Sequence, residues 1–402
     1  MFIPLQIVSE NTGLKKYTTD LTLDINKSNL TFQKNDGGSE ELRIPTHRNV
    51  NIKTNGVVAY ETEVRAKKFT YETDNSIVIG KDKLETINAE DYTLISGGRI
   101  TIERDVAGDI RATTKDKPLK LIGCKNLYAN TGHGHILPYK SDSPIDVLGI
   151  VKIETKTGNV ELGEINGDGD NKISTGSGNV TIKKIKDGEI KTKRGSVKVN
   201  SVRDMKITTS MGKVVVEEAL ANINVYSHRG SVTVGGVGMT VSNPTLESRL
   251  GKVSLTSATG NVVLKTAKAD IKFVNTNSEN IEIYSGGKTT ATGLTGDVKI
   301  NSEKDADLRF NKITGNAIIR LGDKCANLNL YAVNDNASET RYILSGKNVT
   351  MYEDDLNDDV DAYKMDSKSE FTNKLNGQGP LLDVTGKNVV ISAYFKIENS
   401  AI

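Results

Sequence analysis

One short pattern recurs along the middle of the chain, with copies about 17 to 21 residues apart. It consists of a glycine followed, at alternate positions, by two branched apolar residues. Alternation of apolar and polar residues is typical of β-strands with one buried face, and recurrence at a near-fixed spacing indicates a repeated structural unit. The copies are Gly158-Val160-Leu162, Gly178-Val180-Ile182, Gly195-Val197-Val199, Gly212-Val214-Val216, Gly230-Val232-Val234 and Gly251-Val253-Leu255, with later copies at Gly296-Val298-Ile300 and Gly315-Ala317-Ile319.

A second strand-like segment lies about halfway between successive copies of this pattern. Ile190 lies between Val180 and Val197, and Ile207 lies between Val197 and Val214. No segment here keeps the 3.6-residue apolar period of a helix. The sequence therefore predicts a coil of two or more strands, with the glycine at one corner.

Two architectures can use such a pattern. Antiparallel hairpins require turns such as Asn-Gly or Asp-Gly at each reversal, and these dipeptides do not occur at the repeating position. A parallel β-solenoid (β-helix) instead stacks equivalent residues once per coil, which matches a repeat of about 17–21 residues. We therefore expect an all-β, elongated parallel β-solenoid, and keep a hairpin sandwich or barrel as the alternative.

The solenoid interpretation makes a specific prediction for the stretch "KTKRGSVKVNSV". Gly195 is expected at a corner, because the turn requires a positive φ or because adjacent coils approach closely there. Val197 and Val199 should form one rung of a buried ladder, stacked between Val180/Ile182 and Val214/Val216. Lys198 should face solvent.

The repeat is uneven along the 402 residues, and this predicts the organisation of the chain. We expect an irregular β-rich N-terminal part of the solenoid at 1–127 and a proline-containing insertion or seam at 128–148. Regular repeats follow at 149–352. An acidic insertion is expected at 353–380, with a short helix at 369–375, and closing strands or a cap at 381–402, because a bare solenoid end exposes unpaired backbone groups.

Charge and composition argue against several classes of function. There are 53 basic and 51 acidic residues, and the signs are interspersed, which disfavours nucleic-acid binding. No run of 18 apolar residues suggests a membrane span. The start "MFIPLQIVSENTG" does not resemble a signal peptide, so a cytoplasmic or virion-associated location is expected rather than classical secretion. Cys124 and Cys325 form no CxxC pair and are expected to be free thiols.

Three segments have residue types found in binding sites, and none predicts a catalytic, cofactor or metal site. His133 and His135 in "GHGH" have metal-ligand spacing but no third ligand nearby. Asn166, Asp168 and Asp170 resemble the start of a calcium loop, but position twelve is Ser177 rather than Glu. The acidic run Glu353–Asp361 could collect cations. Carboxylates do not mark one face repeatedly, and Trp is absent, so an enzyme is not expected.

The segments "SGNVTIKKI" and "GEIKTKRGSVKV" resemble a bacterial adhesin β-solenoid repeat family, with G-x-V-x-V strands and T-x-x-G corners. The resemblance covers about residues 150–320. A weaker likeness is to bactofilins, which are cytosolic solenoids that polymerise, and to viral β-solenoid fibre proteins. These resemblances imply a solenoid fold and self-assembly or ligand binding.

Together these features predict a non-enzymatic structural or assembly protein, such as a virion or surface-fibre component. An adhesin-like module that binds glycan or protein is the alternative, and a polysaccharide-degrading β-helix is the third. The expected partners are further copies of the chain or neighbouring structural proteins. A glycan is a further possible partner, and nucleic acid is not expected.

Overall fold

The computed structural model of the protein consists of β-strands and turns, with no helix among the residues that it describes. The backbone is described at 7–8, 21–25, 30–32, 49–54, 58–60, 64–74, 76–80, 87–141, 143–235, 241–311, 315–334, 341–345, 348–354, 360–366, 381–386 and 390–397, and side chains within 68–332, 381–386 and 390–394. The chain divides into two compact units, Met1–Ser196 and Val197–Ile402. No described helix is long and apolar enough to cross a membrane.

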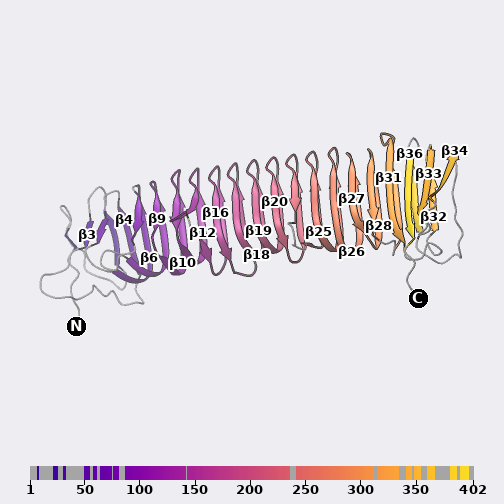
Figure 1. Ribbon diagram of the computed structural model, residues 1–402. Helices are drawn as coiled ribbons and strands as arrows, with labels where there is room; N and C mark the ends of the chain where they lie inside the picture. The colour runs from indigo at the N-terminus through magenta and orange to yellow at the C-terminus, as the bar shows by residue number, and fades with distance from the viewer. Residues whose placement is uncertain are drawn as a thin grey trace, which may run out of the picture. The chain divides into compact units, whose positions relative to one another are not determined.

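Unit 1 is a stack of parallel coils, each built from two main strand runs and a short run at the corner between them (Figure 1). One run of parallel strands is β7–β9–β11–β13–β16–β18 and the other is β6–β8–β10–β12–β15–β17–β18. Its strands are β1 (Ile7–Val8), β2 (Leu21–Ile25), β3 (Leu30–Phe32), β4 (Asn49–Thr54), β5 (Val58–Tyr60), β6 (Val64–Thr73), β7 (Ile77–Ile79), β8 (Ile87–Ser96), β9 (Ile100–Ile102), β10 (Asp105–Thr114), β11 (Leu119–Leu121), β12 (Gly123–Thr131), β13 (Ile136–Pro138), β14 (Asp146–Val147), β15 (Val151–Thr155), β16 (Val160–Ile165), β17 (Lys172–Thr175) and β18 (Val180–Thr192).

Unit 2 has the same construction, and several of its strands bend around a corner and belong to both runs of the coil (Figure 1). Its strands are β19 (Val197–Thr209), β20 (Val214–Ala219), β21 (Ile223–Ser227), β22 (Val232–Val234), β23 (Val241–Ser242), β24 (Pro244–Ser248), β25 (Val253–Thr266), β26 (Ile271–Ser285), β27 (Thr289–Leu294), β28 (Asp297–Ser302), β29 (Ala306–Phe310), β30 (Ala317–Leu321), β31 (Asn327–Asn334), β32 (Arg341–Ser345), β33 (Asn348–Asp354), β34 (Val360–Asp366), β35 (Leu381–Gly386) and β36 (Val390–Ile397).

The core is a set of ladders of branched side chains, as the alternating pattern predicts. Val197 is the Cα partner of Val214 in the next coil, Val199 is the partner of Val216, and all four are buried. Lys198 points outward and pairs with Glu217 at 3.2 Å. Each fully buried branched side chain stabilises its coil by about 1.5–3 kcal/mol, so continuous ladders hold neighbouring coils together. The parallel β-solenoid and its register within unit 2 are confirmed.

Close approach of the backbone explains the repeated glycine. A Cβ on Gly195 would lie 1.7 Å from the carbonyl oxygen of Gly178, and one on Gly178 would lie 1.8 Å from that of Gly158. The φ angle of Gly195 is not positive. Of the two reasons that the sequence left open, contact between stacked corners is therefore the operative one at Gly195.

A buried hydroxyl closes each of these corners. Thr175 Oγ1 donates to the carbonyl of Gly178 at 2.7 Å, and Thr192 Oγ1 donates to that of Gly195 at 2.7 Å. In unit 2 the amide of Gly251 donates to Ser248 Oγ at 3.0 Å. At these corners the T-x-x-G or S-x-x-G motif is a turn whose first and last residues bond to each other, whereas the buried hydroxyl of Ser227, in the corner that ends at Gly230, has no such partner.

The later copies of the glycine pattern lie at the other corner of the coil. Val253 is stacked on Ile271, whereas Val298 of the Gly296 copy is stacked on Ile281, in the second half of β26. Gly296 has a φ of 69°, a conformation that favours glycine. The sequence pattern missed β27 between these copies, because its buried residues include Thr289 and Ala291 rather than Val or Ile.

The segment 128–148, expected to be an insertion or seam, does not interrupt the strand ladders. Its strand β13 pairs with β11 and β16, and β14 pairs with β12 and β16. The prolines are accommodated because Pro138 ends β13 and Pro144 lies in the turn before β14. The helix predicted at 369–375 lies outside the described residues.

The closing strands are not the end of the stack. β35 lies between β30 and β32, and β36 lies between β31 and β33, with parallel pairing on both sides. The outermost pairing is instead the antiparallel one between β33 and β34 (Figure 1). The C-terminal coil is therefore inserted between two coils that precede it in the sequence.

Candidate functional site

A shallow cavity of about 580 Å³ lies at the corners of unit 1 that follow β10, β12 and β15, and His133 contributes to its wall. Three successive corners form it, and they are held in register by backbone hydrogen bonds from His133 to Lys115 at 3.1 Å and from Lys156 to Gly132 at 2.8 Å. The lining residues are Thr114, Lys115, Asp116, Asn130, Gly132, His133 and Lys156.

The cavity has more basic than acidic side chains. Lys115, His133 and Lys156 are exposed and face a single carboxylate, that of Asp116. Ammonium and imidazole groups in this arrangement can hold a carboxylate, sulfate or phosphate group by charge-assisted hydrogen bonds. We name this cavity the corner pocket.

The two histidines are used by the neighbouring corner rather than by a shared metal position. His133 Nδ1 lies 2.9 Å from Thr157 Oγ1, and His135 Nδ1 accepts a hydrogen bond from the amide of Asn159 at 3.0 Å. No group of three or more His, Cys, Asp or Glu side chains suited to a metal ion occurs in the part of the chain that the structure describes.

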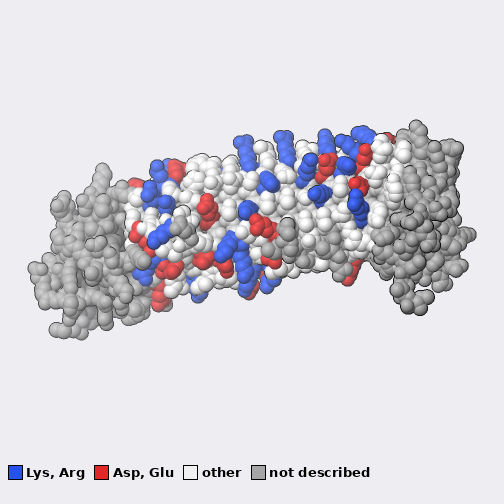
Figure 2. Space-filling model, in the orientation of Figure 1, with Lys and Arg blue, Asp and Glu red and all other residues white. Residues whose placement is uncertain are grey.

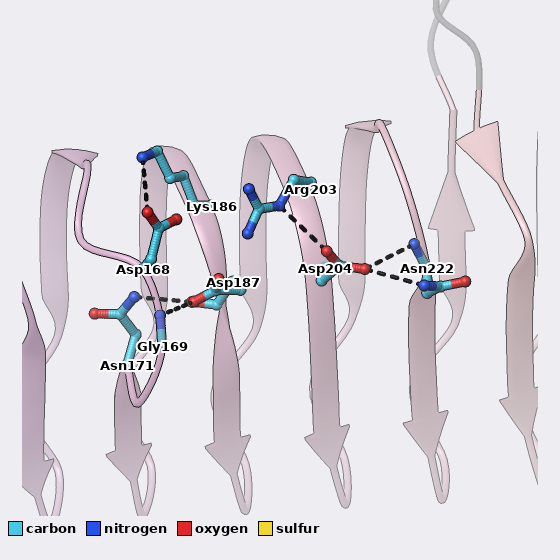
Figure 3. Close-up of polar contacts among 8 residues, drawn as sticks. All are labelled: Asp168, Gly169, Asn171, Lys186, Asp187, Arg203, Asp204 and Asn222. Carbon is cyan, nitrogen blue, oxygen red and sulfur yellow. Dashed lines mark hydrogen bonds and ion pairs between the residues drawn. The ribbon is translucent and has the colours of Figure 1, made fainter.

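The calcium-like loop "NGDGDNK" is a turn at the opposite corner of unit 1 (Figure 3). Asp168 pairs with Lys186 at 3.3 Å, and a carboxylate oxygen of Asp187 accepts a hydrogen bond from the amide of Gly169 at 2.8 Å. The buried Asn171 donates to the backbone carbonyls of Gly167 and Asp187 at 3.1 and 2.9 Å. These contacts hold the loop through Asn171 within it and through Lys186 and Asp187 of the next coil.

Asp170 of the same loop is paired with two lysines, at 2.7 Å to Lys172 and 3.2 Å to Lys152. The hydrogen bonds and positive charges of these lysines lower the pKa of Asp170. The carboxylate of Asp170 therefore pairs with lysines on two adjacent coils, since Lys152 and Lys172 are strand partners.

Unit 2 has a comparable corner, where Arg203 pairs with Asp204 at 3.2 Å (Figure 3). The other oxygen of Asp204 accepts hydrogen bonds from the backbone amide and the side-chain amide of Asn222, at 3.2 and 3.1 Å. Acidic residues at these corners thus join one coil to the next.

Both cysteines are buried free thiols, as the sequence predicted. Burial, together with the charges of Asp109 and Asp105, raises the pKa of Cys124 to about 12. Burial and the charge of Asp305 raise the pKa of Cys325 to about 11. Such thiols are poor nucleophiles, because the thiolate is the reactive form.

The acidic run Glu353–Asp361 is described only as backbone at its two ends, which belong to the antiparallel pair β33 and β34. Its side chains lie outside the described residues.

Sequence reasoning missed two surface features. Tyr331 and Tyr394 are 40 % and 43 % exposed and are Cα partners on β31 and β36. Their juxtaposition depends on the inserted C-terminal coil, which no local pattern reveals. The second feature is a row of basic corners in unit 2, which a strand-by-strand alignment of the T-x-x-G turns would have shown.

Comparison with known proteins identified no matching family model, no matching curated protein and no matching solved structure.

Proposed function

We propose that the protein is a non-enzymatic structural scaffold of stacked β-coils, a component of a virion or of a surface fibre. The observation that carries this proposal is the continuity of each stack, in which buried ladders and glycine corners join each coil to the next. In such arrays each coil is stabilised by its neighbours, so the fold can be lengthened by adding coils and can present repeated contacts along its sides.

Exposed large side chains on the last coils of unit 2 support association with further copies. Ile318, Tyr331 and Tyr394 are each more than a third exposed, and they lie on the neighbouring coils β30–β31 and β35–β36. Exposed Tyr side chains are enriched where protein surfaces meet, and exposed apolar side chains such as Ile318 add to such a patch when they cluster. A side-to-side contact between copies would cover the Tyr331 and Tyr394 pair, which shares one run of strands.

The test is the mass and form of the purified full chain. Light scattering and negative-stain microscopy should show particles of fixed stoichiometry or filaments, and Tyr331→Ser/Tyr394→Ser should weaken their formation. Tyr226→Ser, which changes a Tyr of similar exposure elsewhere in unit 2, serves as the control. A strict monomer at every concentration would contradict the scaffold proposal.

An adhesin-like binding module is the second candidate, and the corner pocket of unit 1 favours it. A glycan array should then show selective binding of acidic glycans that is lost in Lys115→Ala/Lys156→Ala and retained in Lys120→Ala, which lies outside the pocket. Release of oligosaccharides from a polysaccharide panel would overturn both candidates and point to an enzyme.

A further inference from the structure

Five exposed basic side chains lie on four successive corners along one edge of unit 2, the first three of which carry the repeated glycine, and we call this row the basic edge. The corners are the turns that follow β19, β21, β24 and β25. The residues of the basic edge are Lys213, Arg229, Arg249, Lys252 and Lys268.

Backbone hydrogen bonds hold these corners in register, so the row is fixed by the fold. The amide of Arg229 donates to the carbonyl of Ser210 at 2.9 Å, and that of Arg249 donates to Ser227 at 2.9 Å. A Cβ on Gly230 would lie 1.9 Å from the carbonyl oxygen of Gly212, which shows how closely the turns approach. Adjacent corners are therefore separated by about 4.8 Å, the spacing of neighbouring strands.

The basic edge carries little compensating negative charge. The first three corners contain no Asp or Glu, and the fourth contains Asp270, which pairs with Lys252 at 3.4 Å. Among the described residues, Arg229 and Arg249 have no ion-pair partner within 4.0 Å. The nearest acidic residue along the chain is Glu247, on the strand before Arg249. Figure 2 shows Lys and Arg side chains standing along the upper margin of the molecule, over the strands from β20 to β27.

Two exposed apolar side chains share this row with the basic residues. Met211 is 49 % exposed and Leu250 is 36 % exposed, and they occupy the same position of their turns as Arg229 and Lys268. The row thus alternates between apolar and basic side chains from one coil to the next.

We propose that the basic edge binds an extended anionic polysaccharide. Cations held on successive corners can engage carboxylate or sulfate groups along a linear polymer, and arginine does so through paired hydrogen bonds. Met211 and Leu250 supply apolar contacts for the carbon-bearing faces of sugar rings. Single-stranded nucleic acid would instead require a groove with several stacking aromatic side chains, whereas the basic edge is a ridge of turns. This inference goes beyond the scaffold function and does not depend on it.

Binding of labelled polygalacturonate and dextran sulfate to the full chain tests the proposal, with neutral dextran as the reference polymer. Both acidic polymers should bind, neutral dextran should not, and added salt should weaken the affinity. Arg229→Glu/Arg249→Glu should reduce affinity by about tenfold or more, because it reverses two of the cations that replace released counterions. The milder pair Arg229→Gln/Arg249→Gln should give a smaller loss in the same direction.

The control is Lys272→Glu/Lys299→Glu, which changes the net charge equally but on strand faces of unit 2. It should leave the affinity within about twofold, since screened charges away from the contact contribute little. Equal weakening by both charge-reversal pairs, or failure of the unmodified chain to bind either acidic polymer, would overturn the proposal. So would tighter binding of a single-stranded oligonucleotide through the same arginines. Particle formation should survive in all variants, which separates this result from the scaffold test.

Discussion

Leu328 and Ile391 are Cα partners on adjacent parallel strands, although β32, β33 and β34 all lie between them in the sequence. Ile391 is also the partner of Val349 on its other side. The last coil of the chain therefore fills a gap that the earlier part of the chain leaves open. Among the described strands, β30–β31 and β32–β33 are joined only through β35–β36, which lies between them.

Ile391→Asp should disturb both neighbours of this coil. Ile391 is fully buried, and an unpaired carboxylate there should destabilise the end of unit 2 by about 3–5 kcal/mol. Hydrogen–deuterium exchange should then speed up in β31 and in β33 together. Ser392→Asp, one position along and facing outward, is the matched control and should leave both strands protected. Unchanged protection of β31 in Ile391→Asp would mean that the coils stack in sequence order.

Gly195→Ala should lower the stability of unit 1 because of steric overlap with the carbonyl of Gly178. The overlap cannot be relieved by moving a flexible side chain, so we expect a cost of about 3 kcal/mol or more. Gly80→Ala is the control, since a Cβ there meets nothing within 4 Å. Thermal unfolding of the two variants provides the comparison. Equal melting temperatures would show that Gly195 is not in backbone contact with the neighbouring corner.

The strand pattern predicted most of this fold from the sequence, because the core is local and periodic. Val197, Val199, Val214 and Val216 occupy the rungs assigned to them, since alternation and a recurring glycine together determine which residues face inward. The pattern failed where a rung uses small or polar residues. The buried positions of β27 include Thr289 and Ala291, so the Val/Ile pattern did not predict this strand. As a result Gly296 was grouped with Gly251, although the two glycines lie at opposite corners of the coil.

Features that depend on contacts distant in sequence could not be predicted. Nothing local in "GKNVVISAYFKI" indicates insertion between two earlier coils rather than a place at the end. The corner pocket and the basic edge arise from stacking of turn residues, whose identities vary from coil to coil. Net charge of +2 conceals such a row, because acidic residues elsewhere balance it.

Val197→Asp and Lys198→Gln separate the inward and outward faces of β19. Val197 is buried, so an Asp at this position should cost about 3–5 kcal/mol through an unpaired buried charge. Lys198→Gln removes only an exposed pair with Glu217 and should change stability by about 0.5 kcal/mol. Chemical denaturation monitored by circular dichroism checks both variants. Equal destabilisation by the two substitutions would contradict the register of β19.

The buried thiol of Cys124 should make unit 1 less stable at alkaline pH. Its pKa is raised from 9.0 to about 12 in the folded chain, mainly by burial. Between these values the unfolded chain releases the thiol proton and the folded chain keeps it, so the contribution of Cys124 is intact below about pH 9 and is lost progressively up to about pH 12.

At about pH 10.5 this loss should amount to about 2 kcal/mol relative to pH 7. Cys124→Ala should remove that part of the pH dependence of the free energy of unfolding. Lysines and tyrosines titrate in both proteins, so the effect of Cys124 is measured as the difference between the variant and the unmodified protein. Cys325→Ala leaves Cys124 in place, so unit 1 of this variant should still lose stability at alkaline pH. The thiol reagent DTNB should modify neither cysteine of the folded protein at pH 8, because both are buried, and should modify both after denaturation. Rapid modification of folded Cys124 would show that the interior of unit 1 opens far more readily than a continuous ladder of buried side chains allows.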